Sequence, residues 1–190
     1  PMASLFEFAT IEQQAQAIAT RQKDGGNKLE AIPKVSRDTP LPLSFAQERL
    51  WFLDQLMGDN VNYNIPLAYK LQGELNVDAL NRSVDVLLER HEVLRTRLLN
   101  LNGAGYQLVE PPKKRHMHVE ECVSDIALTA VWDEERQFLF DLTSGELIRF
   151  RLLQTASNEH VLIITMHHII SDGWSLGVLF DDLVTAYNAF

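Results

Sequence analysis

The sequence predicts an α/β fold in which a mixed sheet is flanked by helices. Short apolar runs rich in β-branched residues, such as 161–166, alternate along the chain with segments whose apolar residues recur every three or four positions, such as 174–187. Turn-forming residues at 102–105 and 156–159 each lie between two strand-like runs, a pattern typical of β-hairpins. The expected class is therefore mixed α/β, with a sheet that includes hairpins.

Composition is typical of a globular protein that does not bind nucleic acid. The chain has 190 residues, of which 46% are hydrophobic and 23% charged, enough for one domain with a proper core. Its formal net charge of -9 argues against nucleic-acid binding, which favours basic surfaces. The basic run 113–115 is short, lacks interleaved aromatic residues and is interpreted as a solvated loop.

Cysteine content and the lengths of apolar runs argue against disulfides, cysteine-based metal sites and membrane insertion. Cys122 is the only cysteine, which excludes a disulfide within the chain and a multi-cysteine metal site and indicates a small buried side chain. No apolar stretch approaches the ~18–20 residues that a membrane span needs, and the N-terminus lacks the features of a signal peptide. We therefore expect no membrane partner and a cytoplasmic location.

The first 42 residues are expected to lie outside the main domain. An amphipathic helix with Thr10 as an internal N-cap is predicted within residues 1–22, which are interpreted as the end of a neighbouring domain behind a short cloning remnant at 1–3. Residues 23–42 carry the Gly, Pro and charge pattern of an interdomain linker. The main domain is predicted to span residues 43–190.

The main domain is predicted to begin with a helix, a strand and a second helix. Ser44 has the features of an N-cap, and Glu48 lies near the position of a capping-box carboxylate, at the start of a helix that ends at 58–60. Residues 65–71 alternate between apolar and polar side chains, as in a strand, whereas residues 77–89 have helical spacing.

The rest of the domain is predicted to contain five strands and two helices. The first six of these elements are strands at 97–101, 106–109 and 118–122, a helix at 126–138, and strands at 147–154 and 160–166. The last strand is apolar and β-branched enough to be buried on both faces. The segment from Trp174 to Tyr187 is expected to form an amphipathic helix packed on that strand.

Chemistry is concentrated at residues 166–175, where the predicted strand ends and the last helix begins. His167 and His168 are consecutive, so they point to opposite faces of a strand unless the backbone turns between them. One is therefore expected to be structural and the other available. Asp172 lies where it can cap the helix that starts near Gly173 or pair with an arginine.

Arg95 is a candidate for that pairing. It lies with His91, Glu92 and Arg97 at the end of one predicted helix and the start of a strand. Charged residues at such a place most simply cap the helix C-terminus and face solvent. The alternative is that Arg95 turns inward to neutralise a buried carboxylate.

Metal binding and nucleophilic catalysis are weaker interpretations of the same region. His167, His168 and Asp172 are residue types that ligate zinc or iron, but adjacent histidines rarely share one metal and no third strong ligand stands at a helical spacing. Ser171 and Ser175 lie in no Gly-x-Ser-x-Gly elbow. No metal site is therefore expected.

Three segments in fixed order resemble a known family. They are residues 44–53, 90–96 and 166–175, which read SFAQERLWFL, RHEVLRT and MHHIISDGWS. Together they resemble the first three motifs of the condensation domains of nonribosomal peptide synthetases, and the last contains the family pattern His-His-x-x-x-Asp-Gly without departure. The resemblance covers about residues 41–190, and residues 4–20 look like the last helix of a peptidyl carrier domain.

The resemblance implies a fold like that of chloramphenicol acetyltransferase, with an active-site tunnel between two lobes, of which residues 43–190 supply the N-terminal one. It implies that the amine of an amino acid on a downstream peptidyl carrier domain attacks a thioester on an upstream carrier domain. No cofactor is bound directly, because the substrates are presented on phosphopantetheine arms of the carriers. The segment 169–175 resembles the group of domains that accepts an L-configured donor residue.

The same resemblance implies roles for individual residues. His168 is the expected catalytic residue, acting as a general base or through positioning and electrostatics. His167, Asp172 and Gly173 support the turn, and Asp172 pairs with Arg95 or with an arginine of the missing C-terminal lobe. Without that lobe the chain is expected to fold but to lack turnover. Two alternatives stay open: a non-catalytic module that contacts carrier domains or a linker, and another acyltransferase of the same superfamily.

Overall fold

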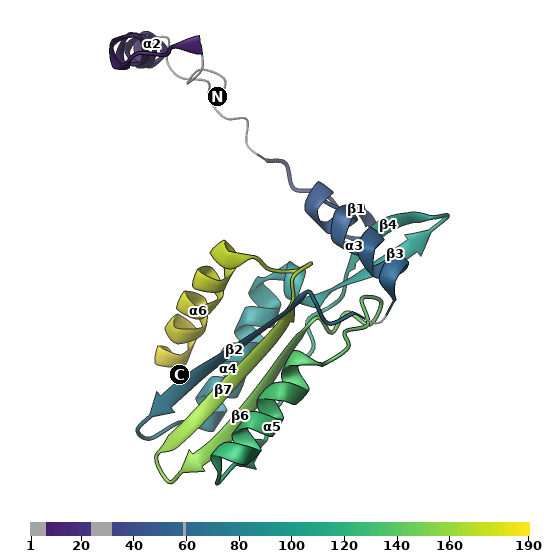
Figure 1. Cartoon of the computed structure of the whole chain (residues 1–190), viewed down its shortest axis with the longest axis vertical. Helices are drawn as coiled ribbons and strands as arrows, with labels where there is room; N and C mark the ends of the chain where they lie inside the picture. The colour runs from purple at the N-terminus through teal and green to yellow at the C-terminus, as the bar shows by residue number, and fades with distance from the viewer. Residues whose placement is uncertain (1–6, 24–31, 59) are drawn as a thin grey trace. The chain divides into compact units, whose positions relative to one another are not determined.

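The computed structural model describes residues 7–23, 32–58 and 60–190 (Figure 1). The chain divides into two compact units, one within residues 1–36 and one within residues 37–190. The predicted cloning remnant and residues 24–31 of the predicted linker lie outside the described residues.

The first unit contains helix α2, Ile11–Lys23. Oγ1 of Thr10 accepts a hydrogen bond from the Gln13 backbone N–H at 3.3 Å, and the Thr10 N–H donates to Oε1 of Gln13 at 3.2 Å. Thr10 is therefore the N-cap, as its side-chain chemistry predicts.

A four-stranded mixed sheet forms the centre of the second unit. Its order is β2-β7-β6-β5, with β2 at Asn64–Gln72, β5 at Val119–Glu121, β6 at Ile148–Ala156 and β7 at Glu159–His167. β7 runs antiparallel to both β2 and β6, while β5 runs parallel to β6. The mixed sheet and the β6–β7 hairpin confirm the predicted class.

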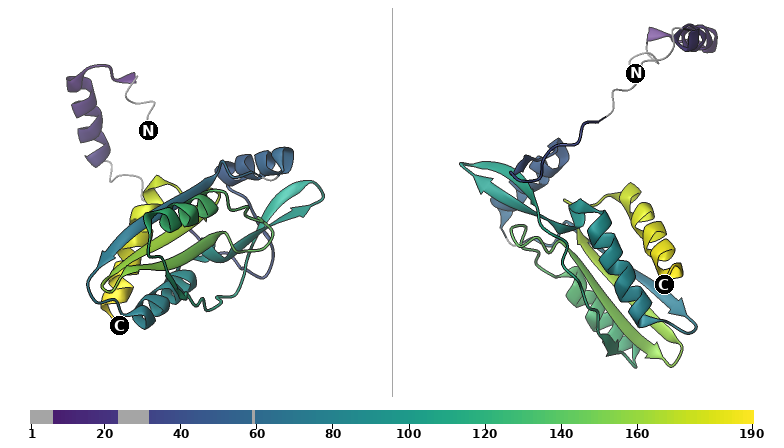
Figure 2. Two further views of the ribbon diagram at one scale, coloured as in Figure 1. Left: turned by 60° about the horizontal axis from the view of Figure 1, so that its bottom comes forward. Right: turned by 180° about the vertical axis from the view of Figure 1, so that it is seen from behind.

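Helices cover both faces of this sheet (Figures 1 and 2). α4, Val77–Arg90, and α6, Gly173–Asn188, pack together on one face, and α5, Asp125–Arg136, lies on the other. The larger apolar cluster, under α4 and α6, includes Leu80, Leu87, Leu152, Leu162, Ile164, Met166 and Leu183. The smaller cluster, under α5, is built on Cys122, Leu153 and Ile163. Cys122 is thus the small buried side chain that the sequence indicates.

β7 is buried on both faces, as its apolar and β-branched sequence predicts. Every residue from Leu162 to His167 is buried. The register pairs Asn64 of β2 with His167, and Ile148 of β6 with Met166. The strand is therefore held from both sides up to the point where the predicted site begins.

A second, three-stranded sheet has the order β1-β4-β3, with β1 at Leu41–Pro42, β3 at Thr96–Leu101 and β4 at Ala104–Val109. The pairing of β1 with β4 is a correction, since the sequence pattern places Leu41 and Pro42 at the end of the linker. Proline is tolerated here because β1 is an edge strand. A 3-10 turn, η1, Glu92–Arg95, joins α4 to β3.

Helix α3, Phe45–Met57, packs against β4 through Trp51. A Cβ atom at Gly105 of β4 would lie 2.8 Å from Cδ2 of Trp51 and 2.6 Å from Cδ1 of Leu43. Both distances are too short for a side chain, so glycine is what lets the helix approach the strand closely.

The capping box of α3 uses Gln47 rather than the predicted Glu48. The Gln47 N–H donates to Oγ of Ser44 at 3.2 Å, and the Ser44 N–H donates to Oε1 of Gln47 at 3.0 Å. Because the helix begins at Phe45, its third position falls on Gln47. Ser44 itself is the N-cap, as predicted.

The packed face of α6 is narrower than the sequence pattern indicates. Leu179 and Leu183 are buried, but Trp174, Val178 and Val184 are 85%, 44% and 41% exposed. Apolar spacing predicts the helix correctly, yet it does not predict which arc of the helix meets the sheet.

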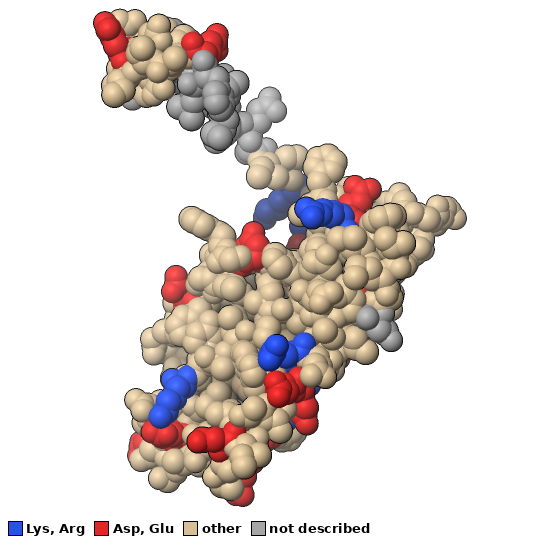
Figure 3. Space-filling model, in the orientation of Figure 1, with Lys and Arg blue, Asp and Glu red and all other residues tan. Residues whose placement is uncertain are grey.

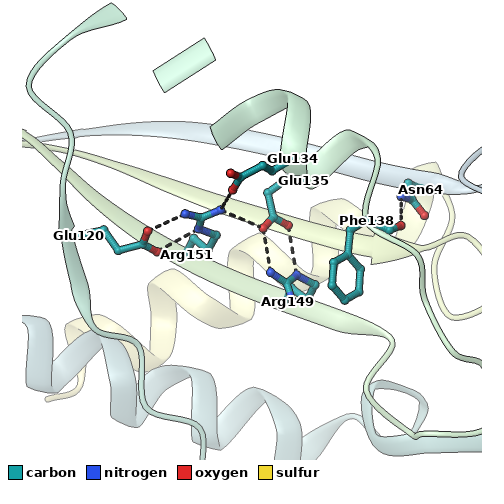
Figure 4. A network of polar contacts seen from close by, with 7 residues as sticks. All are labelled: Asn64, Glu120, Glu134, Glu135, Phe138, Arg149 and Arg151. Carbon is teal, nitrogen blue, oxygen red and sulfur yellow. Dashed lines mark hydrogen bonds and ion pairs between the residues drawn. The ribbon is translucent and has the colours of Figure 1, made fainter. Parts of the chain in front are cut away.

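An ion-pair network holds α5 to the sheet (Figure 4). Glu135, which is 2% exposed, accepts hydrogen bonds from Arg149 of β6 at 3.3 and 3.0 Å. Arg151, two residues along the same strand, donates to Glu120 and Glu134, each at 2.9 Å. Burial alone would raise the pKa of Glu135, but the hydrogen bonds from Arg149 hold it below its ordinary value, so the carboxylate stays charged.

Candidate active site

His167 is the buried member of the histidine pair. It ends β7, is 2% exposed, and its Nδ1 accepts a hydrogen bond from the Ile169 backbone at 3.1 Å. Burial, together with the neighbouring charge of His168, lowers the pKa of His167 to about 4. The ring is therefore neutral near pH 7, and the neutral form supplies the acceptor nitrogen that holds the turn.

Aromatic side chains surround the His167 ring. The rings of Tyr63 and Phe140 have centroids 6.1 Å from it, and Phe140 contacts Phe138 edge to face at 4.9 Å. Arg149 of the ion-pair network lies over the Phe138 ring, 3.8 Å from its centroid. This column of side chains connects the network under α5 to the histidine turn. Sequence reasoning missed it, although the two phenylalanines flanking a single residue were an available signal.

Asn64 fixes the segment that carries these phenylalanines (Figure 4). Its side-chain amide donates to the backbone carbonyls of Phe138 at 2.7 Å and of Arg136 at 3.2 Å. Asn64 is also the β2 residue that pairs with His167. A polar side chain at the start of β2 thus positions a loop beside the site, a role that strand alternation does not reveal.

His168 is the exposed member of the pair. Its backbone N–H donates to the carbonyl of Tyr63 at 2.8 Å, while its side chain lies at the surface. The chain then turns, because the N–H of Ile170 donates to the carbonyl of His167 at 3.1 Å and that of Ser171 to the carbonyl of His168 at 3.4 Å. The two histidines therefore occupy opposite environments, as the alternation of a strand predicts.

His168 lines an open groove of about 630 Å³. The start of α3 forms one wall and the turn between β7 and α6 forms another, and Gln47 joins them by donating to the Ile169 carbonyl at 3.4 Å. Val93 of η1 also lines the groove. All three segments of the predicted motifs, 44–53, 90–96 and 166–175, therefore meet at this groove.

Asp172 is the N-cap of α6 and is exposed. Its Oδ1 accepts from the Ser175 N–H at 2.9 Å, and its own N–H donates to Oγ of Ser175 at 2.7 Å. The hydrogen bond from the Ser175 backbone lowers the pKa of Asp172, so the cap is charged and favourably placed at a helix N-terminus. Gly173 follows, with open space where a side chain would project.

The predicted pair between Asp172 and Arg95 is wrong. Arg95 donates instead to backbone carbonyls at the end of α4, those of Leu88 at 2.9 Å and Glu89 at 3.3 Å, and to the carbonyl of Glu110. Unpaired carbonyls at a helix C-terminus attract a guanidinium group, and Asp172 is already occupied as a cap. Arg95 therefore supports the end of α4 and the segment that follows β4 rather than the histidine turn.

Within residues 7–23, 32–58 and 60–190, no three His, Cys, Asp or Glu side chains lie together as a metal ion would require. No helix in this described part of the chain is both long and apolar enough to cross a bilayer. On the face seen in Figure 3, the described basic side chains lie in small groups with acidic side chains among them. The polar groups that line the groove are an imidazole, a guanidinium, a carboxylate, hydroxyls and an amide.

Comparison with known proteins gives consistent matches. The family model described as Condensation domain matches residues 37–190. Malpinin synthetase of Mortierella alpina is 40% identical over 193 residues, which cover 100% of this chain and 2% of that protein. Nonribosomal peptide synthetase kk1B of Curvularia clavata is 43% identical over 162 residues, covering 83% of this chain and 1% of that protein. The chain thus spans only a few per cent of the length of these relatives.

Solved structures give the same fold. The X-domain from teicoplanin biosynthesis is 30% identical, with a TM-score of 0.75 over 83% of this chain and 34% of that chain. The first condensation domain of the CDA synthetase is 20% identical, with a TM-score of 0.73 over 80% of this chain and 41% of that chain. The second unit therefore has the fold of a condensation-domain lobe, as predicted.

Proposed function

The chain belongs to the condensation-domain family of nonribosomal peptide synthetases, and we propose that it supplies the histidine-bearing lobe of a peptide-bond-forming acyltransferase. The amine of an amino acid on a downstream carrier attacks the thioester carbon of an aminoacyl or peptidyl group on an upstream carrier. An amide forms, the C–S bond breaks and the upstream thiol is released. The observation that carries the proposal is the exposure of His168 in the groove where the three motif segments meet.

His168 is the catalytic residue in this proposal. A neutral imidazole within reach of the attacking amine takes its proton, a role that typically contributes about 10²–10⁴-fold. An α-amine has an ordinary pKa of about 7.7–8.0, so part of it is already neutral near pH 7 and positioning of the amine contributes as well. His167, Asp172 and Gly173 hold the turn that presents His168.

The proposed partners are upstream and downstream peptidyl carrier domains, whose phosphopantetheine arms bring the substrates. No cofactor is needed on the lobe itself. An L-configured donor is proposed because segment 169–175 resembles that group of domains. Residues 1–22 are proposed to end the upstream carrier domain, with a linker that runs from residue 23 to about residue 40, since Leu41 begins β1.

In the proposed enzyme a second lobe closes the open groove into a tunnel. The solved relatives have room for one, because this chain covers 34% and 41% of their chains. A tunnel excludes water and orients both arms, which a single wall does not achieve. The 190-residue chain alone is therefore expected to fold but to lack turnover with loaded carriers. Turnover by this chain alone would contradict that expectation.

A complete condensation domain containing this sequence, with both carriers loaded, tests the catalytic assignment. We expect His168→Ala to lower single-turnover amide formation by about 10²–10⁴-fold without changing thermal unfolding, because the side chain is exposed. His118→Ala is the matched control, since His118 is also exposed but does not line the groove. Normal amide formation by His168→Ala would overturn the assignment. Transfer from acyl-CoA without carriers would indicate another acyltransferase of the superfamily.

A further inference from the structure

A second cavity, of about 140 Å³, adjoins the histidine groove and has no part in the reaction as proposed above. It lies between η1, at the end of α4, and the first turns of α6. Four residues line both cavities, namely Val93, Ile170, Ser171 and Ser175. The groove and this cavity, which we call the α6 pocket, therefore share a wall.

The walls of the α6 pocket are mostly apolar. Leu94, Met166 and Leu179 contribute from the core, where each is at most 7% exposed. Trp174 and Val178 also line the pocket but are 85% and 44% exposed, so they form its rim. Tryptophan is highly buried in most proteins. An exposed indole at the mouth of an apolar pocket can contact a ligand and lose solvent-accessible apolar surface when the ligand binds.

Polar groups at the α6 pocket are few. Nε2 of His91 lies 2.8 Å from Oδ2 of Asp182, and Arg90 pairs with the same carboxylate at 3.1 Å. The Asp182 carboxylate therefore already has partners within the protein. Oγ of Ser171 is buried without a hydrogen-bond partner. A charged guest would lose its hydration here without gaining a free counter-charge, whereas an apolar guest matches the walls.

The shared wall is close to His168 along the chain. The Ser171 backbone N–H donates to the His168 carbonyl at 3.4 Å, and Ser171 lines both cavities. In an aminoacyl group, the side chain branches from the carbon that bears both the amine and the carbonyl. A substrate whose reacting atoms lie at His168 therefore carries its side chain within reach of this wall.

We propose that the α6 pocket receives the aliphatic side chain of an aminoacyl substrate; this inference rests on the condensation function proposed above. One water molecule takes about 30 Å³ of liquid, so the pocket has room for roughly four or five heavy atoms. This is the size of a valine or leucine side chain and well below that of a tryptophan side chain.

NMR of this chain tests binding directly, with the N-acetylcysteamine thioesters of L-leucine and glycine as probes. We expect the leucyl thioester to shift the indole N–H of Trp174 and the methyl groups of Val178, and the glycyl thioester to leave both signals in place. Val178→Trp fills the pocket mouth and is expected to abolish the Trp174 shift. Val184→Trp is the matched control, since Val184 lies on the same helix, is 41% exposed and does not line the pocket. Equal shifts with both thioesters, or equal behaviour of the two variants, would overturn the proposal.

In a complete domain with loaded carriers, the same variants change selectivity. We expect Val178→Trp to lower the ratio of leucyl to glycyl condensation rates about tenfold or more, and Val184→Trp to keep the wild-type ratio. Loading leucine first on the upstream and then on the downstream carrier shows which substrate uses the pocket. An unchanged ratio in both arrangements would overturn the proposal. Normal condensation by His168→Ala would overturn the catalytic role of His168 but would not affect the selectivity change expected for Val178→Trp. The catalytic proposal and the pocket proposal can therefore fail independently of each other.

Discussion

The two faces of the central sheet are built from the same strands by different chemistry. On the side of α4 and α6, β6 contributes Ile148 and Leu152 to an apolar cluster. On the side of α5, the alternate residues of β6 are Arg149 and Arg151, which pair with acidic side chains, and then Leu153 of the smaller apolar cluster. Apolar burial stabilises without direction, whereas charged hydrogen bonds fix geometry. The polar face leads, through Phe138 and Phe140, to the ring of the buried histidine, so it is the face that orients the site.

The largest effect on stability is expected on the polar face. Glu135→Ala leaves Arg149 and Arg151 without their buried partner and should lower the free energy of unfolding by about 3–5 kcal/mol. Glu134→Ala is the matched control, because Glu134 also pairs with Arg151 but its side chain is 67% exposed, and about 0–1 kcal/mol is expected. Urea unfolding at pH 7 measures both. Equal and small losses would show that the network behaves as a surface feature.

A core substitution on the apolar face should cost about 3 kcal/mol at any pH. Leu152→Ala removes a fully buried side chain and leaves a cavity between the sheet and its helices. Leu101→Ala, at a strand end where the side chain is 41% exposed, is the control and should change stability by about 0.5 kcal/mol or less. Urea unfolding at pH 5 and 7 distinguishes the two faces. If the loss of stability in Leu152→Ala changed between these pH values, the expected difference between the apolar and polar faces would be contradicted.

Acid should weaken the polar face first at its histidine end. His167 has an ordinary pKa of 6.5 but a pKa of about 4 in the folded chain. Between these two pH values the unfolded chain binds a proton at this histidine and the folded chain does not. Stability is therefore fully present above pH 6.5 and is lost as the pH falls toward 4, by up to about 3 kcal/mol. The pKa of Glu135 is also lowered, so its contribution is present above its unfolded value and is lost at still lower pH.

A series of urea titrations between pH 3 and 7.5 measures this loss. His167→Asn, which keeps an acceptor for the Ile169 N–H, should flatten the slope between pH 6.5 and 4. Glu135→Gln should flatten only the part at lower pH. His118→Asn changes an exposed histidine and should leave the whole profile as it is. An unchanged slope in His167→Asn would show that another group controls acid sensitivity.

The smallest effect is expected at the exposed turn. Asp172→Ala removes a helix cap and should lower Tm by about 2–4 °C. Asp172→Asn retains the cap and should lower Tm by less. Calorimetry or circular dichroism measures both changes. If Asp172→Ala lowered stability as much as Glu135→Ala does, the result would indicate that Asp172 forms a buried ion pair after all.

Local patterns predict most helices, strands and caps of this chain, because spacing and side-chain chemistry act between near neighbours. β7, α6 and the N-caps at Thr10 and Ser44 all follow in this way. The exposed Trp174 does not, because periodicity gives the spacing of apolar residues and leaves the direction of the neighbouring layer open. The two-residue strand β1 is also too short to have a pattern of its own.

The candidate site was predictable to the same extent. Strand alternation predicts that one histidine is buried and the other exposed, and His167 and His168 follow this pattern. The catalytic role that the motif assigns to His168 stays a prediction. The supports around them come from distant segments, as with Phe140 and Asn64. The two neighbouring phenylalanines can be seen in the sequence, but the sequence does not show that Phe140 contacts His167 or that Asn64 binds the carbonyl of Phe138. Arg95 was predicted wrongly for a different reason. Its positive charge predicts a hydrogen-bond acceptor, but the sequence does not distinguish a carboxylate from the backbone carbonyls at a helix end.

The pairing of Asn64 with His167 and of Ile148 with Met166 also decides which imidazole faces the groove. A deletion of one residue within β7 would bring His168 into the register position of His167, among the aromatic rings, and would move His167 into that of Met166, in the apolar core. An insertion of one residue would instead move His167 into the exposed position of His168. Neither change keeps His168 in the groove and His167 among the aromatic rings, so a chimera joined within this strand has to keep its length.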